Sequence, residues 1–145
     1  MKKNTTVFLL VLLVGTLFRG VMPAEPDSGL TATKTIQVGL MEFTGDGRID
    51  DRSIRQSMAE TLKARGIRSA LVTAAQPETG EFSYFIGVEI KRAKKGSAVN
   101  LIVTLYSKDG RSIIGQVTRT RGGIPDDSIR PLILEGLREL SSRIK

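Results

Sequence analysis

Four cations lie close together in the middle of the chain, at Lys91, Arg92, Lys94 and Lys95. A glycine follows them, so the sequence predicts a basic hairpin tip. A cluster of this density attracts anionic partners such as lipid headgroups, a cell-wall polymer or an acidic protein face. The alternative is a solvated hairpin whose charges keep the chain soluble and oppose edge pairing. With residues expected on nearby strands, the predicted partner-binding set is Lys91, Arg92, Lys94, Lys95, Arg119, Arg121 and Tyr84.

The aromatic residue of that set, Tyr84, is followed directly by Phe85. Adjacent strand residues point to opposite faces of a sheet, so one ring is expected to pack against a helix and the other to lie on an open face. An exposed aromatic near arginine suits a partner surface. The same pair also suits ordinary cross-strand packing.

The residue types that most enzymes rely on are missing. The chain has no Cys and no His, which excludes a thiolate nucleophile, a zinc-thiolate site and a Ser-His-Asp triad. Glu89, Glu135 and Glu139 are the carboxylates considered for catalysis, and the last two fall one turn apart on a predicted solvent face. We therefore expect no enzyme, no catalytic residue, no metal and no cofactor. A carboxylate- or lysine-based hydrolase is the least favoured alternative.

The turn residues at 44–47 (TGDG) predict a loop, and its glycine segment at 45–47 precedes a predicted helix, where free N–H groups could hold a phosphate. However, Asp46, Asp50 and Asp51 would repel an anion there. Their spacing also does not match a calcium-binding EF-hand loop. The favoured interpretation is a glycine turn followed by aspartate helix caps.

The first 24 residues are typical of an export signal. Lys2 and Lys3 precede an apolar run over residues 7–18, and Ala24 suits the last position before cleavage. The run is shorter than the ~20 residues that span a bilayer as a helix, although an uncleaved membrane anchor remains the alternative. A lipoprotein is excluded because there is no cysteine to carry the lipid. The predicted location is therefore periplasmic or secreted.

The signal also accounts for much of the positive charge. The whole chain has a net charge of +7, whereas residues 25–145 hold 19 basic and 15 acidic residues, a net of +4. This bias is too mild to indicate specific nucleic-acid binding. Residues 25–34 are polar and small, and read as a flexible leader. Residues 35–145 are expected to form a single domain.

The periodicity of that domain predicts an α+β fold: a two-layer sandwich in which a mixed, mostly antiparallel sheet of four to five strands carries two helices on one face. Asp109-Gly110 predicts a hairpin turn, and broken alternation near Gly115 predicts a bulge. The expected strands are 35–43, 69–75, 82–92, 98–106 and 112–120. The first helix is expected to begin at a cap formed by Asp50 or Asp51, and the last to begin near 126–128.

The two helices show apolar stripes at three- and four-residue spacing. In the first helix Arg52, Arg55, Lys63 and Arg65 are expected to face water. The inward residues are expected to be Ile54, Met58, Thr61 and Leu62 in the first helix, and Ile133, Leu137, Leu140 and Ile144 in the second.

Three segments carry a resemblance to a group of bacterial envelope domains. They are the strand end LMEFTGD at 40–46, the strand YFIGV at 84–88, and the apolar strand and Asp-Gly turn at 101–110. In this order, with a helix after the first and a closing helix at the end, they resemble the N-terminal domain of TolB, the activator LpoB and the secretion protein CsgG. The resemblance covers most of residues 35–144. It implies this fold and an envelope location, and it carries over no binding residue.

Taken together, the sequence predicts an exported, non-enzymatic envelope protein that acts as a protein–protein interaction or accessory module. Its expected partner is another envelope protein. The alternative is a binder of an anionic polymer or membrane surface through the basic hairpin at 91–95. The sequence leaves the oligomeric state open.

Overall fold

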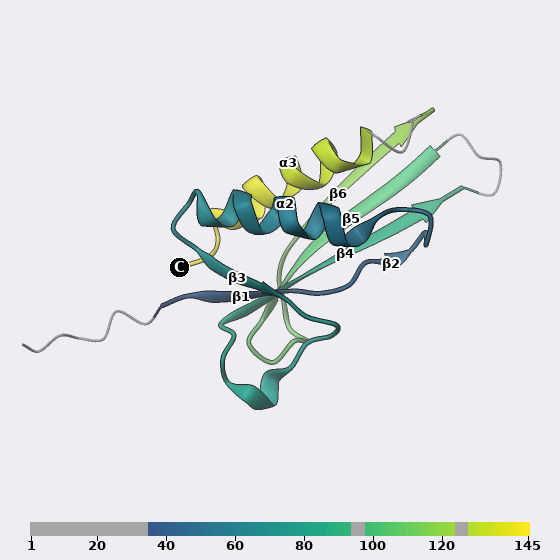
Figure 1. Ribbon diagram of the computed structural model, residues 1–145. Helices are drawn as coiled ribbons and strands as arrows, with labels where there is room; N and C mark the ends of the chain where they lie inside the picture. Colours follow the sequence, from purple (N-terminus) through teal and green to yellow (C-terminus); the bar gives the residue numbers. More distant parts are fainter. Residues whose placement is uncertain (1–34, 94–97, 124–127) are drawn as a thin grey trace, which may run out of the picture. The chain divides into compact units, whose positions relative to one another are not determined.

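The computed structural model describes residues 35–93, 98–123 and 128–145 (Figure 1). The signal, the leader, and Lys94 and Lys95 of the basic cluster lie outside this part. The strands are β1 (Gln37–Leu40), β2 (Thr44–Gly45), β3 (Arg68–Leu71), β4 (Tyr84–Arg92), β5 (Ala98–Ser107) and β6 (Ile113–Gly122). The helices are α2 (Asp51–Lys63), α3 (Ile129–Ser141) and the short 3-10 turn η1 (Pro77–Thr79).

The sheet is mixed and has the strand order β3-β1-β4-β5-β6, with β2 beside β4. β1 pairs in parallel with β3 and β4, and helix α2 makes the crossover from β1 to β3. β4, β5 and β6 form the predicted antiparallel meander. Both helices lie on the same face of the sheet (Figure 1). The predicted α+β class, with two helices on one face, is therefore confirmed.

Local features differ in part from the predictions. The register shift between Leu105 and Tyr106, opposite Gly115, confirms the bulge. Thr44–Gly45 was expected in a loop, but it pairs in parallel with β4 and gives the sheet a sixth strand. Glycine is required there, because Gly45 has φ of 105° and a Cβ would lie 2.0 Å from the carbonyl oxygen of Ile90.

The main core lies between the helices and the sheet. Ile54, Met58 and Leu62 of α2 are buried as predicted, and so are Ile133, Leu137 and Leu140 of α3. They pack on the alternate residues of the central strands that face the helices: Ile86, Val88, Ile90, Leu101, Val103 and Leu105. Helix α2 begins at its predicted cap, where Asp50 Oδ1 accepts a hydrogen bond from the backbone N–H of Ser53 at 3.2 Å.

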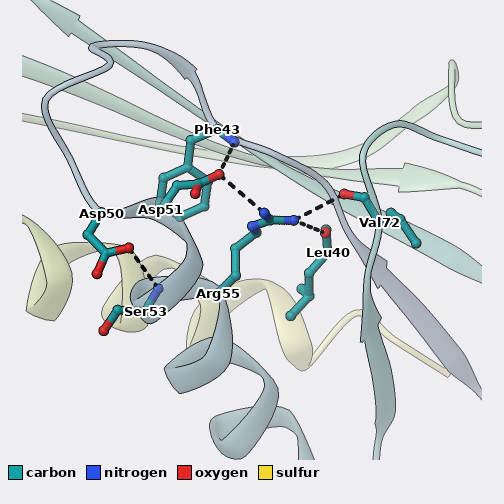
Figure 2. A network of polar contacts seen from close by, with 7 residues as sticks. All are labelled: Leu40, Phe43, Asp50, Asp51, Ser53, Arg55 and Val72. Carbon is teal, nitrogen blue, oxygen red and sulfur yellow. Dashed lines mark hydrogen bonds and ion pairs between the residues drawn. The ribbon is translucent and has the colours of Figure 1, made fainter.

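Arg55 overturns one prediction, because it faces the sheet rather than water. Its side chain is only 8% exposed. Its Nη1 donates to the carbonyl oxygens of Leu40 at 3.3 Å and Val72 at 3.1 Å, at the carboxyl ends of β1 and β3. Its Nη2 lies 3.4 Å from Asp51 Oδ2, which also accepts the backbone N–H of Phe43 (Figure 2). A single guanidinium thus links the helix to two strand ends.

Among the described residues, no helix is long and apolar enough to span a membrane.

We predict that Arg55→Met lowers the free energy of unfolding by about 2–4 kcal/mol, since it leaves buried carbonyls and Asp51 without their donor. Urea unfolding followed by circular dichroism measures this change. Arg52→Met is the matched control on the exposed side of the same helix, and its expected effect is within about 0.5 kcal/mol. Equal effects of the two substitutions would contradict the role of Arg55.

Candidate functional site

The described part of the basic hairpin is divided between the two faces of the sheet. Lys91 lies on the face opposite the helices, 58% exposed, and its Nζ is 2.9 Å from Glu89 Oε1. Arg92 is its neighbour in β4 and so points to the helix side. Their side chains therefore leave the strand on opposite faces, although both residues line one hollow of about 510 Å³ together with Arg48.

Arg92 is engaged with an acid. Its Nε donates to Asp46 Oδ2, and the backbone N–H of Asp46 donates to the carbonyl of Ile90 at 3.1 Å. The Arg92 hydrogen bond holds the pKa of Asp46 below its ordinary value. This pair fastens the loop after β2 to the end of β4. Asp46 therefore has a structural role in this loop.

The two arginines of β6 also differ. Arg119 Nη2 lies 2.8 Å from Glu139 and 3.8 Å from Glu135, so it links the edge strand to α3. Both carboxylates are more than half exposed and are bound to a cation, which suits a surface pair and not a catalytic one. Arg121 is exposed near the end of β6.

Tyr84 and Phe85 point to opposite faces, as expected, but neither is a free aromatic surface. Tyr84 lies half-buried on the helix side, where its hydroxyl donates to the carbonyl of Lys145 at 3.1 Å. Phe85 is fully buried, although it lies on the other face. Its ring packs 5.3 Å from that of Phe82, and Gly110 of the β5–β6 hairpin lies nearby. Loops therefore cover this end of the second face.

The rest of the second face carries no described element. Its residues form polar cross-strand pairs: Gln116 Nε2 donates to Thr104 Oγ1 at 3.1 Å, and Thr120 Oγ1 to Asn100 Oδ1 at 3.2 Å. One strongly apolar residue stands out, because Ile113 is 59% exposed at the start of the edge strand. We call this surface of β4, β5 and β6 the open face.

A groove between α2 and α3 was not anticipated. It has a volume of about 420 Å³ and three arginines, Arg65, Arg130 and Arg138, in its lining. The other lining residues are Ser57, Glu60, Thr61, Ala64 and Leu134. The sequence held one indication of this groove: positions 130, 134 and 138 are spaced four residues apart, which places them on one side of a helix. Their shared groove depends on how α3 lies beside α2, which spacing alone does not give.

Within residues 35–93, 98–123 and 128–145, no group of three or more acidic side chains is arranged to hold an ion.

No protein-family model and no curated protein sequence matches the chain. Its structure is similar to that of PelC from Paraburkholderia phytofirmans, solved as a dodecamer, with a TM-score of 0.53 and 17% identity over 77% of this chain and 89% of that one. TolB from Acinetobacter baumannii also matches, with a TM-score of 0.49 and 10% identity over 74% of this chain and 28% of that one. The match to PelC establishes a likeness of fold alone. TolB, named above by resemblance, is thus among the structures matched, while the grouping with LpoB and CsgG stays a prediction.

We predict that Asp46→Asn lowers stability at neutral pH by at most about 1 kcal/mol, because it weakens a partly exposed ion pair. The pKa of Asp46 is lowered by folding, so its contribution is complete above the unfolded pKa of about 4 and is lost as pH falls through the lower folded value. Urea midpoints at pH 7 and pH 3 measure this. The difference between the two proteins should shrink at pH 3, and a difference independent of pH would count against the ion pair.

Proposed function

We propose that this chain is an exported, non-enzymatic accessory protein of the bacterial envelope that binds another protein through its open face. The observation that carries the proposal is the one-sided covering of the sheet. Both helices pack on one face, and the described part of the chain leaves most of the other face bare. A sheet with one uncovered face and a long edge strand offers a ready surface for a partner.

The open face is suited to specific recognition. Gln116 and Thr120 are exposed and offer hydrogen bonds at fixed positions, since they are set by the strand register and by their cross-strand pairs with the buried Thr104 and with Asn100. Ile113 adds an exposed apolar side chain beside the half-buried ring of Tyr106, with which it pairs. Exposed apolar and aromatic side chains beside polar groups are common in protein–protein contacts.

The absence of Cys and His supports a role without catalysis. Export rests on the apolar segment at 7–18, which lies outside the described residues. The resemblance to TolB-type envelope domains agrees with this location.

We predict that a photoreactive amino acid placed at Ile113 crosslinks to one discrete envelope protein in intact cells. The same group at Gln56, exposed on α2, is the control and should not give that product. Immunoblotting and mass spectrometry identify the adduct. No adduct at Ile113 would refute binding through the open face. An adduct with twice the mass of the chain would instead indicate self-association, as PelC shows in its dodecamer.

A further inference from the structure

The positive charge of the domain is concentrated in the helical layer. Residues 51–67 and 129–145, which comprise the two helices and the turns after them, hold eight basic and four acidic residues, a net of +4. This equals the net charge of residues 25–145, so the remainder of that stretch is neutral. The sheet and its loops are therefore not the basic part of this protein.

The groove between α2 and α3 gathers three of these cations. Arg65 Nη1 donates to Ser141 Oγ at 2.7 Å, and Arg130 Nη2 donates to Ser57 Oγ. Both bonds cross between the helices, so they place the two guanidinium groups at the groove. Arg138 lies on α3 between them and is exposed.

In the described part of the chain, none of these three arginines has a carboxylate within ion-pair distance, whereas Arg55, Arg92 and Arg119 each have at least one. The only acid in the groove lining is Glu60. A guanidinium has five N–H donors, so the single hydrogen bonds to serine leave most donors available.

We infer that this groove binds an acidic polypeptide segment that also carries apolar side chains. Arginine is suited to carboxylates, because its planar fork can donate two parallel hydrogen bonds to one. Leu134, half-buried, and Ala64 supply apolar lining between the cations. That lining favours a peptide over an anionic polysaccharide, which has no apolar side chain to place there. A hollow between helices also fits a chain better than a membrane surface.

The groove lies between the helices and is separate from the open face, so binding there would be a second interaction beyond the proposed function. It can be measured with the purified domain. The purified domain is titrated against a short fluorescein-labelled peptide of Glu and Leu, and binding is followed by fluorescence anisotropy. We expect saturable binding that weakens as salt is raised. A peptide of Glu and Ser with the same charge should bind more weakly, because it cannot use the apolar lining.

The decisive variant is Arg130→Gln with Arg138→Gln, for which we expect affinity for the Glu and Leu peptide to fall about tenfold. Lys108→Gln with Arg111→Gln removes the same charge from the exposed β5–β6 hairpin and should change affinity less than about twofold. Arg138→Glu alone is a second variant, since its side chain has no contact in the described structure whose loss would disturb folding. Circular dichroism confirms that each variant is folded.

Three results would overturn the inference. The first is no binding of the Glu and Leu peptide. The second is an equal loss of affinity in the groove and hairpin variants, which would show that only net charge matters. The third is binding of polygalacturonate or phosphatidylglycerol vesicles in preference to the peptide. If the double variant Lys91→Gln with Arg121→Gln no longer binds the polygalacturonate or the vesicles, the basic residues predicted from the sequence form the anion-binding site instead.

Discussion

The arrangement of the domain depends on a buried cation. Arg55 hydrogen-bonds the carbonyls at the carboxyl ends of β1 and β3 and pairs with Asp51, so the helix and both parallel strands meet at one guanidinium. Parallel strands have no hairpin to set their alignment, and their connecting helix must be positioned by packing. A buried ion pair need not add to the net stability of a fold. Removing Arg55, however, would leave the carbonyl oxygens of Leu40 and Val72 and the carboxylate of Asp51 without this hydrogen-bond donor.

The sheet separates the domain into two chemically different sides. The apolar alternate residues face α2 and α3, which present their arginines outward. In the described part of the chain, the opposite side carries polar cross-strand pairs, and loops cover it around Phe82 and Phe85. Both helices pack on the same face of the sheet, so no described helix covers the other face, which is left as surface. The two candidate surfaces consequently differ in chemistry: one is a groove with arginine cations, and the other is a flat array of hydroxyl and amide groups.

The candidate site was the least predictable part. The basic cluster is visible in the sequence as a run of charges. Side chains alternate along β4, however, so Lys91 and Arg92 lie on opposite faces of the sheet, and Arg92 forms an ion pair with Asp46. Arg119 likewise forms an ion pair with Glu139 of α3. Acids distant in the sequence therefore neutralise cations that look available in it. Arg65 and Arg130 are 65 positions apart, and only helix packing places them in one groove.

By itself, the sequence determined the local elements. Turn residues, apolar periodicity and, for α2, the Asp50 cap specified both helices, the meander and the bulge opposite Leu105, because these depend on neighbours along the chain. The missing Cys and His restricted the chemistry in the same direct way. Tertiary structure decided which charges are free. It buried Arg55, paired Arg92 and Arg119, and left the groove arginines with no carboxylate of the described residues within ion-pair distance, since Coulomb interactions depend on separation in space and not along the chain.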